Sequence, residues 1–142
     1  FDVVMVGFNL LNPSARDRVF PHTLEHDVGT LIMFAVRRAL SQPEALSELV
    51  AGLVESGEVD ARKLNAEDPL QFLREHADVS SIVEAAYRFC RHEPGAHVIL
   101  TGTGNADHLT QNVAAIQARP LPDEIRSALR ALFGGVDSVS GN

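Results

Sequence analysis

The sequence predicts an α/β fold with about three parallel strands and covering helices. Three short apolar segments, residues 2–9, 29–36 and 97–101, have the length and the β-branched content of strands buried on both faces. Segments with helical periodicity lie between and after them. Because strands that alternate with helices are joined by crossovers, we expect repeated strand–helix units and a parallel sheet.

The segment after the first strand and the long region after the second contain helix signals. Residues 15–26 predict a short helix that is interrupted near Pro21. A second helix, which Gly57 would end, is indicated by apolar residues at helical spacing, namely Leu46, Leu49, Val50 and Leu53. Asp68 followed by Pro69 predicts a helix cap with proline at the first helical position.

The later part of the chain predicts three more helices, at residues 80–90, 107–117 and 122–133. The third strand, residues 97–101, lies between the first two of them. A sheet of three such strands would have helices on one face only, so its other face and its edges would stay uncovered. We therefore expect a second copy or further chain to cover that face.

Composition restricts the class of protein. The chain has 142 residues, which suits one domain, and its 12 basic against 19 acidic residues give a formal net charge of -7. Without clustered lysine or arginine, a nucleic-acid surface is not expected. No apolar run approaches the roughly twenty residues that cross a bilayer, and we predict a cytoplasmic protein with no membrane partner. The single cysteine, Cys90, excludes an intrachain disulfide and is interpreted as a small apolar helix residue.

The turn after the third strand is the best candidate for a binding site. Gly102 and Gly104 lie between the strand and the helix, where glycine can adopt dihedrals closed to other residues and lets backbone N–H groups approach a ligand. The first turn of the helix would offer further N–H donors to a phosphate. An ordinary connection capped by Asn105 remains the alternative, since the dinucleotide fingerprint needs a glycine where Asp107 stands.

Four segments together resemble the C-terminal part of aldo/keto reductases: residues 1–12, 28–34, 98–112 and 132–142. Residues 45–67 have the character of an insert. The resemblance implies a partial (β/α)₈ TIM barrel, with strands six to eight and their helices in residues 1–142 as a single incomplete domain. The sequence starts at Phe1, inside an expected strand, so we expect a piece of a longer protein or the loss of its leading residues. Members of this family use NADPH to reduce aldehydes and ketones.

The resemblance also implies a cofactor site on the last strand and helix. Its candidate residues are Gly102, Thr103, Gly104, His108, Gln111 and Asn112. The turn would contact the adenosine phosphate, and the last two residues would contact the adenine. Gly102 and His108 stand where lysine and arginine are common in the family. With those two cations absent, affinity for the 2'-phosphate and selectivity for NADP over NAD should be weakened.

Three further residues fall near positions that contact the cofactor in the family. Met5 stands where a glutamine often holds the nicotinamide amide, and Met33 stands where an aromatic ring often stacks. Either methionine could shape an apolar pocket, but strand core is the favoured interpretation. Arg37 either reaches the pyrophosphate or is a solvated surface residue.

The catalytic tetrad of the family, an Asp, a Tyr, a Lys and a His, comes from the first half of the barrel. The only tyrosine here, Tyr87, lies in an apolar helical pattern, and the only lysine, Lys63, lies in a polar stretch. We interpret them as a packing residue and a solvated charge, so this chain is not expected to reduce carbonyls by itself. The alternative function is a self-associating truncated barrel that acts as a non-catalytic nucleotide-binding or structural module.

One short motif indicates a different chemistry. His22, Glu25 and His26 match the H-x-x-E-H pattern of inverted zinc peptidases, with Glu84 as a guess for the further acidic ligand. The segment has room for barely one helical turn, so a surface pair of histidines is the favoured interpretation. Neither Ser14 nor the pair at residues 80–81 has the context of a nucleophilic serine.

Overall fold

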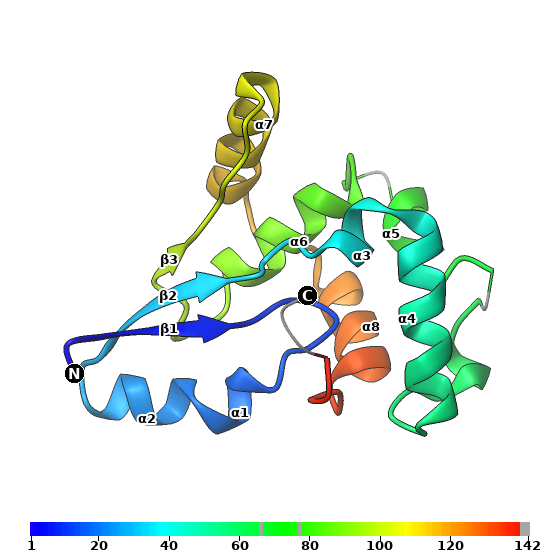
Figure 1. Ribbon diagram of the computed structural model, residues 1–142, viewed down its shortest axis with the longest axis horizontal. Coiled ribbons are helices and arrows are strands. Elements are labelled where there is room, and N and C mark those ends of the chain that lie inside the picture. The colour runs from blue at the N-terminus through cyan, green and yellow to red at the C-terminus, as the bar shows by residue number, and fades with distance from the viewer. Residues whose placement is uncertain (66, 77, 140–142) are drawn as a thin grey trace.

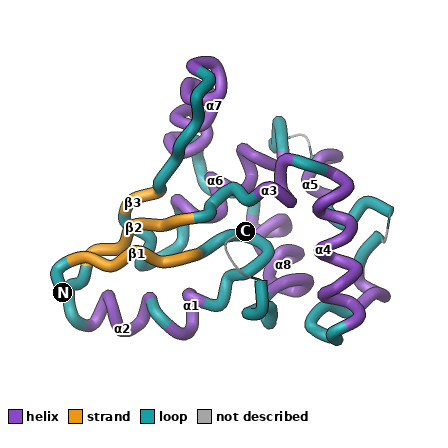
Figure 2. The backbone as a smooth tube through the Cα atoms, in the orientation of Figure 1, coloured by secondary structure: helices purple, strands orange, loops and turns teal. Residues whose placement is uncertain are grey.

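The computed structural model describes residues 1–65, 67–76 and 78–139 and contains the predicted parallel sheet (Figures 1 and 2). Its strands are β1 (Val3–Gly7), β2 (Gly29–Met33) and β3 (Val98–Ile99), in the spatial order β1-β2-β3. Both neighbouring pairs are parallel, which confirms the fold class. All three strands are shorter than predicted, because sheet pairing ends at residues 7, 33 and 99.

Eight α-helices and one 3₁₀ helix make up the other elements of the described residues. They are α1 (Ala15–Arg18), α2 (Phe20–Glu25), α3 (Arg38–Ser41), α4 (Pro43–Glu55), η1 (Ala61–Lys63), α5 (Gln71–Glu75), α6 (Ile82–Arg91), α7 (Ala106–Gln117) and α8 (Asp123–Phe133). Two of the helix predictions were wrong in detail. The segment 15–26 forms two helices, and Pro21 lies in the first turn of α2, where a missing N–H costs nothing. Pro69 precedes α5, whose N-cap is Leu70.

Two glycines in the loops that follow helices have left-handed backbone conformations. Gly57 follows α4 with φ of 80°, which confirms that it ends this helix. Gly95 follows α6 with φ of 91°, and a Cβ atom added there would lie 2.7 Å from the Cβ of Phe20. Gly95 is therefore required twice, by the backbone angle and by the packing of α2.

The sheet has one covered face and one exposed face. Val6, Ile32 and Ile99 are buried on the covered face. On the other face Met5 pairs in register with Leu31, and Leu31 with Val98, so these three side chains form a row across the sheet. The exposed fractions of Met5 and Val98 are 57% and 48%. The prediction of strands buried on both faces was wrong, and so was the strand-core interpretation of Met5, whereas the expected uncovered face is confirmed.

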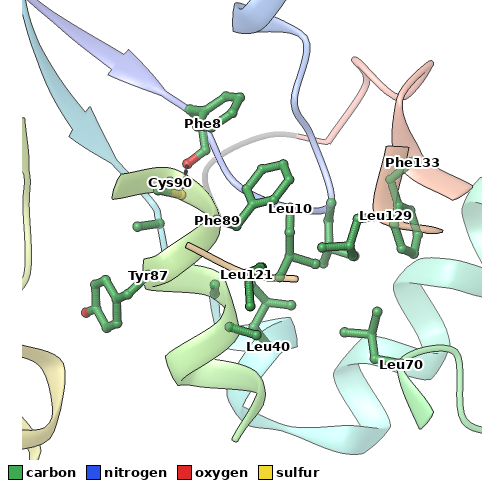
Figure 3. Packing of buried hydrophobic residues seen from close by; sticks show 14 of the residues in the cluster. Phe8, Leu10, Leu40, Leu70, Tyr87, Phe89, Cys90, Leu121, Leu129 and Phe133 are labelled. Atoms are coloured by element: carbon green, nitrogen blue, oxygen red, sulfur yellow. Dashed lines mark hydrogen bonds between the residues drawn. The ribbon is translucent and has the colours of Figure 1, made fainter. Parts of the chain in front are cut away.

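Helix α6 lies at the centre of the core (Figure 3). The ring of Phe89 stacks on that of Phe8, at 5.4 Å between centroids, and Phe8 meets Phe20 edge to face. The fully buried Cys90 thiol donates a hydrogen bond to the carbonyl of Phe8 over 3.4 Å, and burial raises the pKa of this thiol. The interpretation of Cys90 as a packing residue is confirmed.

Arg88 of α6 holds the connection between α7 and α8. Only 2% of its side chain is exposed, and its guanidinium donates to the carbonyls of Arg119 at 2.9 Å and Pro120 at 3.0 Å. The same group forms ion pairs with Asp78 at 2.9 Å and Glu84 at 2.8 Å and donates to the Asp78 carbonyl. Buried arginine is stable only when its donors are satisfied in this way. Arg88 therefore fixes the end of α7 against α6.

Helix α7 projects away from the rest of the molecule (Figure 1), and α6 is its main neighbour. Leu109 and Val113, one turn apart on α7, are 46% and 42% exposed. Helix α7 therefore leaves an apolar pair open to solvent.

Candidate functional site

A cleft of about 1000 Å³ lies at the carboxyl ends of β2 and β3. Its walls come from residues 34–36 after β2, from the N-terminal half of α6, from the turn at residues 100–103 and from α7. In sheets of parallel strands, ligands bind at this edge because the loops that follow the strands meet there. The structure thus brings the end of the second strand together with the turn and helix that the sequence singled out.

Five of the six predicted cofactor residues line this cleft, namely Gly102, Thr103, His108, Gln111 and Asn112. Gly104 is exposed but is not part of its wall. All of them except Asn112, which is 8% exposed, are open to solvent. The chain therefore places most of the predicted residues around one space.

The glycines of the turn are not required for the reason that the sequence indicated. Neither Gly102 nor Gly104 has φ in the left-handed region, and a Cβ atom added at either would meet no other group within 4 Å. The expectation that they adopt dihedrals closed to other residues was wrong. Their remaining contribution is that they leave the backbone of the turn uncovered.

The start of α7 is capped by the protein itself. The Asn105 side chain accepts hydrogen bonds from the N–H groups of Asp107 at 2.8 Å and His108 at 3.3 Å, which confirms it as the helix cap. These are two of the donors that a phosphate would need at a helix N-terminus. Asp107 also places a negative charge in the first turn. In this conformation the helix end does not form the phosphate cradle expected from the turn.

Asn112 belongs to a hydrogen-bond network that crosses three elements. Its side-chain nitrogen donates to the Thr101 hydroxyl oxygen over 2.9 Å, and the same oxygen lies 2.8 Å from the Tyr87 hydroxyl of α6. All three residues line the cleft. The sequence pattern did not indicate the link between Thr101 and Tyr87, since nothing in it pairs two residues that lie 14 positions apart.

Arg37 is buried, which overturns its interpretation as a solvated surface residue. The residue is 5% exposed, and its Nε and Nη1 atoms are buried without a hydrogen-bond partner among the described residues. Burial lowers the pKa of its guanidinium. Arg37 directly follows Ala35 and Val36, which line the cleft. An unpaired buried guanidinium is costly and is well suited to an anionic group from outside the protein.

The remaining sequence candidates lie elsewhere. Tyr87 is buried in α6, as its apolar pattern predicts, and Lys63 is exposed in η1. His22, Glu25 and His26 are all exposed, and the ring of His26 contacts the carbonyl of His22. Over the part of the chain that the structure describes, no group of three or more His, Cys, Asp or Glu side chains is arranged to hold a metal ion. None of the helices within the described residues has the length and apolar character needed to cross a membrane.

The three parallel strands with covering helices and a cleft at their carboxyl ends define part of a (β/α) barrel. The sequence model of the aldo/keto reductase family matches residues 1–132, and the chain belongs to this family. The matched range includes residues 45–67, which the sequence resemblance leaves out. It stops at residue 132 and so contains only the first residue of the resembling ending 132–142. No curated protein matches the chain.

Solved structures show the same fold. An aldo-keto reductase from Bacillus halodurans resembles the chain in its apo form with a TM-score of 0.59 at 20% sequence identity. Its holo form gives a TM-score of 0.57 at 21% identity. Each comparison covers 96% of this chain and 44% of the other. The chain therefore spans less than half the length of these relatives, which confirms the partial barrel.

Proposed function

We propose that the chain is the NADP(H)-binding C-terminal part of an aldo/keto reductase-type oxidoreductase and is inactive by itself. The observation that carries the proposal is the cleft at the carboxyl ends of β2 and β3, because five of the six residues implied by the family resemblance line it. The family membership of residues 1–132 supports the same class of cofactor. The bound dinucleotide would supply hydride to a carbonyl substrate.

The residues of the cleft fit such a ligand unevenly. Arg37 is not among the residues that line the cleft, but it follows the apolar wall at residues 34–36. Its Nε and Nη1 atoms are buried without a partner among the described residues, which would suit the charge of a pyrophosphate. At the turn, however, Gly102 and His108 replace the fixed cations of the family, and Asn105 already occupies two N–H donors. We infer that the 2'-phosphate is held weakly and that the preference for NADPH over NADH is small.

Arg37 provides the sharpest test of anion binding, because the adjacent Arg38 is a matched control. Arg38 is exposed, and its Nε donates to Gln42 at 2.8 Å. Since hydrogen bonds to charged groups contribute about 1.5 to 3 kcal/mol, Arg37→Met should weaken NADPH binding by roughly tenfold or more. Arg38→Met should change the affinity less than about twofold, as expected for an exposed charge.

The two variants are compared by fluorescence titration with NADPH and NADH and by urea unfolding. In the absence of ligand, Arg37→Met should unfold at the same urea concentration or a higher one, because it removes an unpaired buried charge. Equal NADPH affinities for the two variants would show that Arg37 does not face the ligand. A wild-type chain that binds neither dinucleotide would exclude the cofactor proposal.

The absence of activity is tested separately. We expect residues 1–142 to show no NADPH-dependent reduction of a broad panel of aldehydes, because the only tyrosine has its hydroxyl bonded to Thr101 and the only lysine is solvent-exposed. Turnover that co-purifies with the chain and survives repurification would overturn this proposal. Activity that depends on a second chain would support it.

A second candidate function, a self-associating non-catalytic module, rests on the uncovered sheet face. The row formed by Met5, Leu31 and Val98 is apolar and open to solvent, and pairing two such faces would bury it. Sedimentation velocity should then show a dimer that Met5→Lys dissociates. Leu24→Lys is the control, since Leu24 is 47% exposed but lies on α2, away from the sheet face. A monomer across the concentration range excludes the self-associating module.

A further inference from the structure

We propose that Tyr87 is a positioning residue of the cleft, which acts through Thr101 to set the orientation of the Asn112 side-chain amide. The inference rests on the proposed nucleotide-binding function and extends it to the choice of base. In the structure the Asn112 nitrogen donates to Thr101 over 2.9 Å, and Thr101 is also bonded to the Tyr87 hydroxyl over 2.8 Å. The amide nitrogen is thereby engaged within the protein, and its oxygen is left for a ligand.

The hydroxyl group of Thr101 explains how Tyr87 can set the orientation of the Asn112 amide. Thr101 has a single hydroxyl proton and two lone pairs. The 2.8 Å distance fits either hydroxyl as the donor, and we assign the Thr101 proton to the Tyr87 oxygen. Only lone pairs then remain for Asn112, so the amide must donate its N–H and turn its oxygen away. Without the Tyr87 hydroxyl, the Thr101 proton is free to bond the Asn112 oxygen instead. The amide can then rotate by half a turn and present its NH₂ group.

The Asn112 side-chain oxygen has no hydrogen-bond partner among the described residues, so the orientation of the amide decides which group a ligand would meet. Asn112 is 8% exposed, yet its oxygen is not among the buried unpaired atoms of the described residues. That oxygen accepts none of the side-chain hydrogen bonds recorded in the same part of the chain. Figure 3 shows the ring of Tyr87 at the edge of the core with its hydroxyl directed away from the packed side chains. The Tyr87 hydroxyl is thus held by the core and reaches the network from α6.

The expected consequence is selectivity for a base that offers an N–H donor. An amide oxygen accepts from the exocyclic amino group of adenine, whereas hypoxanthine has a carbonyl oxygen at the same position and would oppose one acceptor with another. We therefore expect the wild-type chain to bind NADPH about tenfold more tightly than its hypoxanthine analogue, deamino-NADPH, as one net hydrogen bond allows.

The test is a fluorescence titration of both dinucleotides against Tyr87→Phe, Thr101→Val and a control. Tyr87→Phe keeps the ring and its packing, and Thr101→Val keeps the shape of the side chain while removing the central hydroxyl. Thr110→Val is the matched control, because Thr110 lies on α7, the helix that contains Asn112, but on its exposed side. Its hydroxyl donates only to the carbonyl of Ala106. Far-UV circular dichroism and urea midpoints establish that each variant is folded.

We expect the preference for NADPH over deamino-NADPH to fall below about threefold in Tyr87→Phe and Thr101→Val and to stay unchanged in Thr110→Val. A purely structural role for Tyr87 would lower both affinities together and leave their ratio intact, which overturns the inference. Equal binding of the two dinucleotides by the wild-type chain also overturns it, while leaving the proposed cofactor function in place. Binding of neither dinucleotide would overturn both.

Discussion

Replacing Arg88 by alanine should destabilise the protein more than any exposed charge would. The side chain is 2% exposed and serves two carboxylates and three backbone carbonyls, those of Asp78, Arg119 and Pro120. Its removal leaves the partly buried Glu84 carboxylate without its cation and leaves Asp78 with only the exposed Arg119 as a partner. Breaking a buried ion pair in this way costs about 3 to 5 kcal/mol, a large share of the roughly 5 to 15 kcal/mol that stabilises a typical domain.

The expected loss of unfolding free energy in Arg88→Ala can be converted into a shift of the urea midpoint. With a denaturant slope of about 1.5 to 2 kcal/mol per molar urea, a loss of about 4 kcal/mol lowers the midpoint by about 2 to 3 M. Arg88→Lys should fall between the wild type and Arg88→Ala, because one ammonium cannot reach all the acceptors that the planar guanidinium serves. The measurement is far-UV circular dichroism at one protein concentration, since association would shift the apparent stability.

Arg62→Ala is the control for loss of an ion pair without burial. Arg62 pairs with Asp60 at 2.9 Å, but 89% of its side chain is exposed, and solvent screens the pair. Its midpoint should match that of the wild type. A midpoint for Arg88→Ala that coincides with that of Arg62→Ala would refute the reasoning, since it would mean that the buried guanidinium and its acceptors are replaced by water at little cost.

Three further predictions concern stability and reactivity. Gly95→Ala should destabilise the fold by about 2 to 5 kcal/mol in urea melts, since a left-handed residue costs about 1 to 2 kcal/mol and an overpacked contact, here with Phe20, about 1 to 3. A midpoint shift below about 0.3 M on the same scale would contradict this. Burial raises the pKa of Glu84, but hydrogen bonds from Ser80 and Arg88 outweigh it and lower the pKa below its ordinary 4.5. The ionised Glu84 carboxylate therefore adds stability that is complete above pH 4.5 and is lost as the pH falls through the lowered pKa. When urea midpoints are measured from pH 3 to 6, Glu84→Gln should show a smaller drop in midpoint toward low pH than the wild type. An equal drop in both proteins would contradict this prediction. Because burial raises the pKa of the Cys90 thiol, iodoacetamide should label it at least a hundredfold more slowly in buffer than in urea, and equal rates would place the thiol in contact with solvent.

The sequence was most informative where local rules act. Residue periodicity, a cap and a glycine suffice to place α4, α6, α7 and α8, because helix starts and ends depend on neighbours a few positions away. Ser81 and Asn105 cap their helices with their own side chains. The resemblance to the aldo/keto reductases depends on residues farther apart in the sequence. The family match over residues 1–132 confirms it for the segments 1–12, 28–34 and 98–112.

The details of the candidate site could not be predicted from the sequence, because they depend on which polar atoms come into hydrogen-bond contact after folding. The two glycines of the turn predicted a phosphate-binding loop. In the structure the Asn105 side chain accepts hydrogen bonds from the N–H groups of Asp107 and His108 instead. The sequence left open whether Arg37 is a solvated surface residue, and only the structure shows that it is buried while the adjacent Arg38 is exposed. Neither outcome follows from spacing, since a polar group finds its partners only after the chain has packed.

By itself, the sequence determined the class of fold and the order of its strands and longer helices, and it indicated a candidate segment for a cofactor site. Only the tertiary structure decided which face of the strands is covered, leaving Met5 exposed and Ile32 buried. It also brought Tyr87, Thr101 and Asn112 into one network at the wall of the cleft. The physical reason is that periodicity specifies which residues share a face, whereas burial and hydrogen bonding depend on the elements that pack against that face.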